Sequence, residues 1–98
     1  MRYILSERAN RDIRKITDFI RKDNPQAAEK VAVRILEAIR RIAEHPNVGH
    51  VHSDIQIPAL RVYRVYSYLI VHKVEAKVVK IVSVVHGARD LKRIFRKG

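Results

Sequence analysis

The sequence predicts an α+β domain in which an N-terminal strand and a helical hairpin pack on an antiparallel β-meander, followed by a short C-terminal helix. Three observations support this fold class. Apolar residues recur with helical period through the first half, β-branched residues crowd the second half, and helix breakers separate the two. Grouped helices followed by grouped strands, in the order β-α-α-β-β-β-α, are typical of α+β folds with antiparallel sheets.

The first half predicts a strand and a helix. Residues 2–5 are rich in β-forming side chains, and Ser6 ends this run. Ser6 is also a suitable N-cap for a helix, because its hydroxyl can accept from a free backbone N–H of the first turn. The helix that follows has one apolar stripe and is expected to stop near Lys22 and Asp23; the stripe consists of Ala9, Ile13, Ile16 and Ile20.

A second helix is predicted after Asn24-Pro25, an N-cap residue followed by proline at the first helical position. It must end by His45, because Pro46 disfavours helical backbone in the residue before it. Two amphipathic helices joined by so short a segment fold back as a hairpin with one shared apolar face. The apolar stripe of this second helix comprises Ala28, Val31, Ala32, Ile35, Ile39 and Ile42.

Three strands are predicted after a loop that contains Pro46, Gly49 and Pro58. They span Leu60 to Val65, Tyr68 to Val74 and Val78 to Val85. The last two are apolar on both faces, so we expect them to be central in the sheet. Alternation along the strands predicts which side chains share a face. It groups Leu69 with Val71 and Lys73 against Tyr68, Ile70, His72 and Val74, and groups Val79 with Ile81 and Val85 against Val78, Val82 and Val84.

The C-terminal segment predicts one more helix. Gly87 breaks the last strand, and Asp90 is a candidate cap for a short basic helix from Leu91 to Arg96. The place of the N-terminal strand in the sheet does not follow from spacing.

Composition limits the class of protein. A chain of 98 residues fits a single domain, residues 1–98. The absence of cysteine excludes disulfides and thiolate metal sites and suits a reducing compartment. No apolar run approaches the roughly 20 residues needed to span a bilayer. We therefore expect a cytoplasmic protein that does not bind membranes.

The charge balance is strongly basic. Twenty-one Lys and Arg against ten Asp and Glu give a formal net charge of +11, and residues 49–98 alone contribute +7, with ten basic and three acidic residues. Such a field attracts phosphates, anionic surfaces or an acidic protein segment. Charge alone does not select among these partners.

One short motif has metal-ligand character. His50-Val51-His52-Ser53-Asp54 spells H-x-H-x-D, which resembles part of a binuclear metallohydrolase signature. However, Ile55 stands where that signature has histidine, and the remaining ligands are lacking. We therefore predict no metal site and no cofactor.

A second constellation has the residue types of a two-base ribonuclease. His72 and His86 could transfer protons near neutral pH, and Arg61 and Arg89 could stabilise a phosphorane. Arg64 adds a further cation. Spacing does not show whether these side chains converge, and a histidine on a strand is also common in purely structural positions.

Nucleic-acid binding without chemistry is a third reading of the same strands. Tyr63, Tyr66 and Tyr68 interleave with Arg61 and Arg64, and such aromatic and basic strands can stack bases. No recognition motif accompanies them. Tyrosine is also an ordinary strand residue, so this alternative stays open.

The chain resembles the RelE/ParE toxin superfamily, and its ParE branch most closely. The resemblance rests on three blocks: Pro46-Asn47-Val48-Gly49-His50 with Asp54, Tyr66-Ser67-Tyr68-Leu69-Ile70-Val71, and Val84-Val85-His86-Gly87-Ala88-Arg89-Asp90-Leu91. The helical half matches this superfamily in pattern more than in letters. RelE-type mRNA cleavers commonly place arginine after the tyrosine that opens the third strand, where this chain has Leu69. This difference favours the ParE branch.

The resemblance implies a toxin without catalytic activity of its own, which inhibits DNA gyrase and acts close to DNA. It implies neutralisation by a ParD-like antitoxin that wraps an acidic segment around the toxin. The candidate target-binding residues are Arg61, Arg64, His86, Arg89, Arg93 and Arg96.

Within this resemblance, two alternatives to a gyrase-inhibiting toxin remain. The first is a ribosome-dependent mRNA endoribonuclease of the RelE type, which would use His72, His86, Arg61 and Arg89 as its catalytic residues. The second is a binding module that has lost its toxicity and retains only antitoxin pairing.

Overall fold

The computed structural model describes residues 1–51, 57 and 59–95, with the side chains of Ala88 and Arg89 outside the description. The elements follow the predicted order, β-α-α-β-β-β-α. Their bounds are β1 Arg2–Leu5, α1 Glu7–Arg21, α2 Pro25–Glu44, β2 Arg61–Val65, β3 Tyr68–Glu75, β4 Val78–His86 and α3 Gly87–Phe95. The predicted α+β fold is therefore confirmed.

Both predicted caps of the helical hairpin form. The Ser6 hydroxyl accepts from the N–H of Ala9, and the Asn24 side chain accepts from the N–H of Ala27, with Pro25 at the first helical position. These bonds satisfy backbone donors that a helix start otherwise leaves open.

The sheet has the strand order β1-β4-β3-β2. β2, β3 and β4 form the expected antiparallel meander, and β3 and β4 are central as predicted. β1 lies at one edge and pairs in parallel with β4, from Arg2↔Val78 to Leu5↔Ile81. The other edge strand, β2, follows the long loop after α2.

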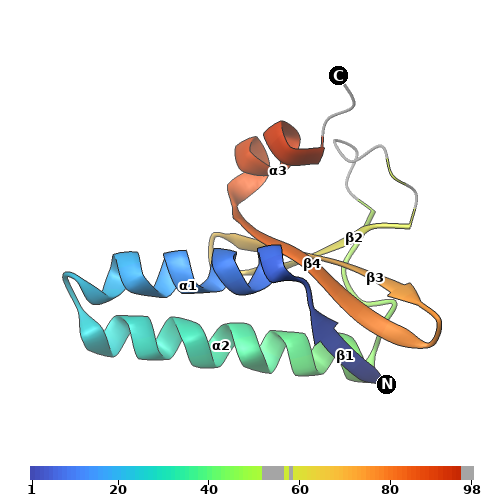
Figure 1. Cartoon of the computed structure of the whole chain (residues 1–98), viewed down its shortest axis with the longest axis horizontal. Helices are drawn as coiled ribbons and strands as arrows, with labels where there is room; N and C mark the ends of the chain where they lie inside the picture. The colour runs from blue at the N-terminus through green and yellow to red at the C-terminus, as the bar shows by residue number, and fades with distance from the viewer. Residues whose placement is uncertain (52–56, 58, 96–98) are drawn as a thin grey trace.

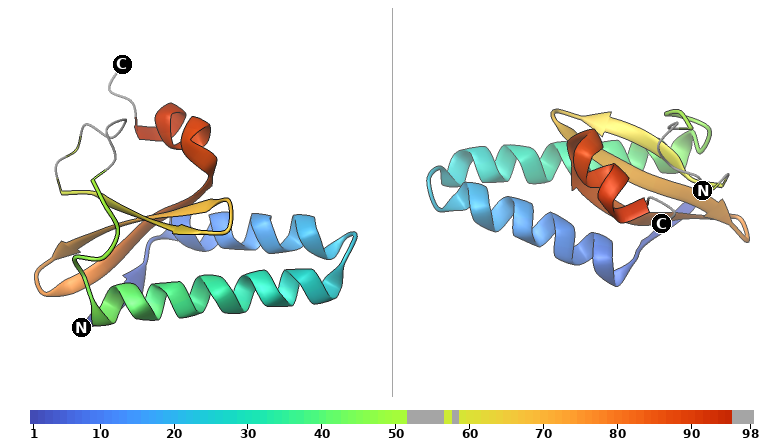
Figure 2. Two further views of the ribbon diagram at one scale, coloured as in Figure 1. Left: turned by 180° about the vertical axis from the view of Figure 1, so that it is seen from behind. Right: turned by 90° about the horizontal axis from the view of Figure 1, so that it is seen from above.

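The sheet separates two apolar layers. The helical hairpin covers one face and α3 covers part of the other (Figures 1 and 2). The larger cluster lies between hairpin and sheet and includes Ile35, Ile39, Ile42, Ile70 and Ile81. The smaller lies under α3 and includes Leu60, Val62, Leu69, Val71, Val85 and Leu91.

The predicted faces of β4 are wrong for Val84 and Val85. Val84 packs with Val79 and Ile81 on the hairpin side, whereas Val85 packs under α3. The reason is a β-bulge, since His72 pairs with Ile81 while Val71 pairs with Ser83, which leaves Val82 as an extra residue. One extra residue reverses the phase of a two-residue alternation.

Asp12 of α1 stabilises the strand just after this bulge. Its carboxylate accepts from the Ser83 hydroxyl at 2.8 Å and from the backbone N–H of Val84 at 3.0 Å. It thereby supplies an acceptor to a strand edge that β1, which ends at Leu5, no longer covers.

The last helix begins earlier than predicted. It starts at Gly87, so Asp90 lies in its first turn and is not a cap before Leu91. Gly87 has φ +86°, a value that glycine adopts without steric cost, and this turns the chain from strand directly into helix. The Asp90 carboxylate still lies near the positive end of the helix dipole.

Candidate interaction surface

Arg61 holds the loop that precedes β2. Its Nη2 donates to the carbonyl oxygens of Asn47 at 2.8 Å and Gly49 at 3.1 Å, and its Nε lies 3.5 Å from that of Val48. The loop also pairs directly with β2, through the two backbone bonds between His50 and Val62. Arg61 therefore uses much of its donor capacity on its own chain.

Gly49 fits this loop because it has no side chain. Its φ is +85°, and a Cβ built there would lie 2.3 Å from the carbonyl oxygen of Val62. The loop can approach β2 this closely only with glycine at position 49.

His72 lies directly opposite Arg61 in the β2–β3 ladder and is fully buried. Neither ring nitrogen has a hydrogen-bond partner among the described residues. Burial, the largest cause, and the positive charge of Arg61 together lower the pKa of His72 from 6.5 to about 4, against a smaller opposing effect of the Val48 backbone. The imidazole is thus neutral near pH 7 and has no access to solvent.

His86 has the opposite environment at the other end of the meander. It is exposed, its Nε2 lies 3.0 Å from the Ser67 hydroxyl, and its ring is 5.0 Å from that of Tyr68 between centroids. His86, in β4, pairs with Tyr68 of β3, and Tyr68 is four residues along β3 from His72. At about 3.3 Å per residue, the two histidines are separated by about 13 Å along the sheet.

The remaining predicted arginines have different surroundings. Arg64 is exposed and its Nε donates to the carbonyl of Tyr66 at 3.0 Å. Arg93, on α3, has a side chain that is 78% exposed and lies 3.4 Å from Asp90. Arg89 belongs to α3, but its side chain lies outside the described residues, as does all of Arg96.

The structure does not gather the proposed nuclease residues. Arg61 and His72 lie at one end of the β2–β3 ladder, with His72 sealed from solvent, while His86 lies at the other end. A two-base reaction needs both proton-transferring groups within reach of one substrate. Leu69, at the position where cleavers commonly have arginine, is buried under α3.

The H-x-H-x-D motif at residues 50–54 lies only partly within the residues that the structure describes. His52 and Asp54 lie outside the described residues, and His50 serves as a backbone partner of β2. Across residues 1–51, 57 and 59–95, no group of three or more potential ligands could hold a metal ion. In the same part of the chain, no helix is long and apolar enough to cross a membrane.

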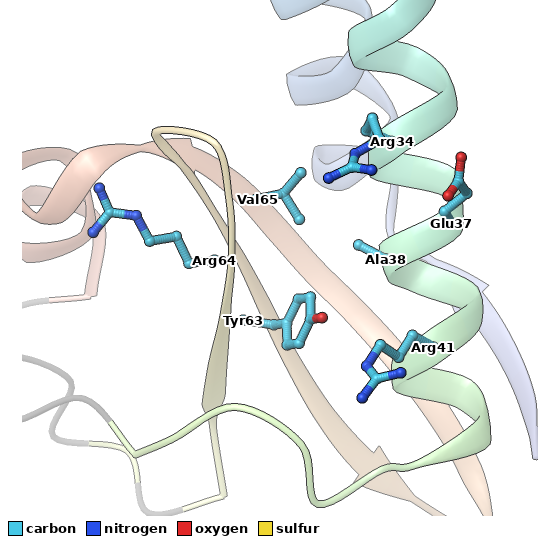
Figure 3. A pocket seen from close by; sticks show the side chains of 7 residues that line it. All are labelled: Arg34, Glu37, Ala38, Arg41, Tyr63, Arg64 and Val65. Atoms are coloured by element: carbon cyan, nitrogen blue, oxygen red, sulfur yellow. The ribbon is translucent and has the colours of Figure 1, made fainter.

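A groove between α2 and β2 is lined by three arginines and one glutamate. It has a volume of about 370 Å³ and is lined by Arg34, Glu37, Ala38, Arg41, Tyr63, Arg64 and Val65. In Figure 3, Arg34 and Arg41 extend from α2 toward Val65 and Tyr63, whereas Arg64 points away from α2. The floor is apolar, because Ala38 and Val65 are buried.

Sequence reasoning missed the helix side of this groove. Arg34 and Arg41 are seven residues apart, two helical turns, and Ala38 lies between them on the same face. This seven-residue spacing is the signal in the sequence that indicates the helix side of the groove. The guanidinium carbon of Arg34 also lies 5.7 Å from the centre of the Tyr66 ring, within the range of a cation–π contact.

Comparison with known proteins identifies the family. Residues 3–91 match the family model described as the ParE toxin of the type II toxin-antitoxin system parDE. The chain belongs to the ParE toxin family. The resemblance noted from its three sequence blocks is confirmed.

A solved structure supports the fold independently. The structure titled "Chromosomal ParDE TA system from P. aeruginosa" superposes with a TM-score of 0.76 at 19% identity, covering 89% of this chain and 96% of that one. At this sequence identity, the similarity shows a shared fold and nothing more. A search of curated proteins gave no significant match.

Proposed function

We propose that this ParE-family toxin inhibits DNA gyrase and is neutralised by direct binding of a ParD-like antitoxin. The observation that carries the proposal is the family match over residues 3–91. The proposed site of action is the cytoplasm, beside the DNA that gyrase holds.

The geometry supports a binding role over a catalytic one. The two candidate general bases, His72 and His86, are about 13 Å apart along the strands, and His72 is buried and neutral. By contrast, Arg64, His86 and Arg93 are exposed. Exposed arginines at the surface of a +11 chain attract an anionic partner without any reaction.

The test of the target is a gyrase assay with the purified chain. We expect loss of supercoiling and accumulation of cleaved DNA in proportion to added toxin. Normal supercoiling at excess toxin would overturn the gyrase proposal, and codon-linked cuts in translated mRNA, detected by primer extension, would establish the RelE-type alternative instead.

Matched variants test how the surface acts. Charge reversal by Arg64→Glu together with Arg93→Glu is expected to weaken gyrase inhibition at least tenfold, whereas His86→Ala changes it less than threefold, because a docking surface depends on charge more than on one proton donor. Abolition by His86→Ala alone would contradict the binding role.

The antitoxin is tested by the adjacent reading frame. We expect it to encode a short protein with an acidic tail, and its product to copurify with this chain and restore supercoiling. A copurifying partner with no detectable toxicity of the free chain would support the third reading, a binding module that has lost its toxicity.

A further inference from the structure

The outer edge of β2 is open for part of its length. β2 lies at the end of the sheet and pairs with β3 on one side only. On the outer side, Val62 exchanges both backbone bonds with His50. Because backbone groups alternate direction along a strand, the N–H and C=O of Arg64 face the same outer side. Neither forms a backbone bond there with any residue in the described part of the chain.

The cationic groove lies alongside this open edge. Arg34 and Arg41 come from α2, about 10 Å apart along the helix axis at 1.5 Å per residue, and neither forms an ion pair within the described ranges. Glu37 also lines the groove, but in Figure 3 its carboxylate is turned away from Tyr63. Two guanidinium groups without a carboxylate partner therefore lie beside a strand edge without a pairing strand, although Arg34 also contacts the Tyr66 ring.

An extended peptide can satisfy both the arginines and the strand edge. An added strand supplies both a carbonyl and an N–H to Arg64, whereas a DNA backbone supplies acceptors alone. Side chains on one face of an extended strand recur about every 6.7 Å, so carboxylates on alternate residues fall within reach of the two long arginines. The apolar floor at Ala38 and Val65 accommodates a small aliphatic side chain between them.

We propose that an extended acidic peptide segment adds to β2 as a fifth strand, pairing with the backbone of Arg64 and placing carboxylates at Arg34 and Arg41. This inference deepens the antitoxin part of the proposed function, since an acidic tail is the segment that would supply such a strand. It assigns a binding role to two residues of the helical half that no family motif indicates.

The test measures binding of a capped nine-residue peptide of alternating valine and glutamate to the full chain. The comparison peptides replace every glutamate by glutamine, or the central residue by proline. We expect the glutamate peptide to bind at least tenfold more tightly than either. Equal binding of the glutamine peptide would overturn the role of the arginines, and equal binding of the proline peptide that of strand pairing.

Protein variants separate the groove from general charge. Arg34→Gln with Arg41→Gln should weaken binding at least tenfold. The control, Arg11→Gln with Lys15→Gln, removes the same charge from exposed positions of α1 and should change it less than twofold. Equal loss in both pairs would show non-specific attraction and overturn the site.

Two variants of Arg64 and hydrogen exchange at its amide test the pairing at the strand edge. Arg64→Pro removes the outward N–H while Arg64→Gln keeps it, and proline is tolerated on an edge strand. We expect the proline variant to bind at least fivefold more weakly than the glutamine variant, and the Arg64 amide of the native chain to gain hydrogen-exchange protection when peptide binds. Binding that leaves this amide unprotected, or equal protection by a ten-nucleotide oligothymidylate, would overturn the proposal.

These measurements contain no gyrase and no antitoxin. A chain that fails to inhibit gyrase can still bind the peptide, which would reject the target and keep the strand-addition site. A chain that inhibits gyrase but does not bind the peptide would reject only the site.

Discussion

The two ends of the β2–β3 ladder contain the same residue types and differ in nearly every physical respect. At one end, Arg61 is engaged by loop carbonyls and His72 is buried with a depressed pKa. At the other end, Arg64 and His86 are exposed. Residue type alone therefore does not mark a site. Burial and backbone partners decide which arginine and which histidine are available to another molecule.

The largest loss of stability is expected from substitution of Gly49, next to Arg61 at the buried end of the β2–β3 ladder. Gly49→Ala should lower the unfolding free energy by about 4 kcal/mol, because the new Cβ meets the Val62 carbonyl at 2.3 Å in addition to the cost of positive φ. Gly87→Ala is the matched control, since φ is +86° there and nothing lies within 4 Å of the added Cβ. It should cost about 1 kcal/mol in denaturant unfolding, and equal losses would refute the close-approach argument.

His72 makes the folding stability of the protein sensitive to acid. Its folded pKa of about 4 lies below the unfolded value of 6.5, so the stability contributed by the neutral ring is fully present above pH 6.5 and is lost as the pH falls toward 4. The loss amounts to about 3 kcal/mol.

The measurement compares the native chain with His72→Leu, which cannot titrate, by urea unfolding at pH 7 and pH 4. The difference in unfolding free energy between the two should shift by about 3 kcal/mol in favour of the variant. A constant difference across this range would show that the ring is already solvated or paired.

Arg61 and Arg64 provide the next comparison. Arg61→Ala should destabilise by about 2 kcal/mol, because the carbonyls of Asn47 and Gly49 lose a charged donor. Arg64→Ala should cost about 0.5 kcal/mol or less, since its side chain is exposed and donates to one nearby carbonyl. Thermal unfolding of both variants measures the contrast, and a reversed order would contradict it.

The smallest effect is expected at His86. His86→Ala should change the unfolding free energy by about 0.5 kcal/mol or less, because its contacts with Ser67 and Tyr68 lie at the surface. The same variant should show no change in acid sensitivity, in contrast to His72→Leu. A loss as large as that of Arg61→Ala would mean that this end of the sheet is also structural.

Most of the fold could be predicted because local signals agree. Ser6, Asn24 and Pro25 mark helix starts by chemistry that acts within one turn, and the stripes of isoleucine and alanine define the buried faces. The parallel pairing of β1 with β4 could not be predicted, since it joins residues 76 positions apart and leaves no periodic trace. The bulge at Val82 depends on pairing between strands and was likewise invisible.

The interaction surface was less predictable than the fold. Alternation correctly grouped Tyr68 with Ile70 on one face, which the structure places on the hairpin side. It did not reveal that Arg61 is occupied by the Asn47–Gly49 carbonyls, because that contact crosses a loop whose path the sequence does not specify. The groove was missed for a related reason: Arg34 and Arg41 meet Tyr63 only after α2 has docked under the edge strand.

The position of β1 has a consequence for synthesis. Its strand neighbour is β4, and the Ser6 hydroxyl and Asp12 carboxylate also bond to residues 82–84. During synthesis, residues 2–12 emerge before the residues 78–84 that they bond to, and they cannot be ordered in the sheet until those residues are available. A nascent chain interrupted before residue 78 lacks β4, the strand that joins β1 to the meander, so the four-stranded sheet forms only after that strand has been made.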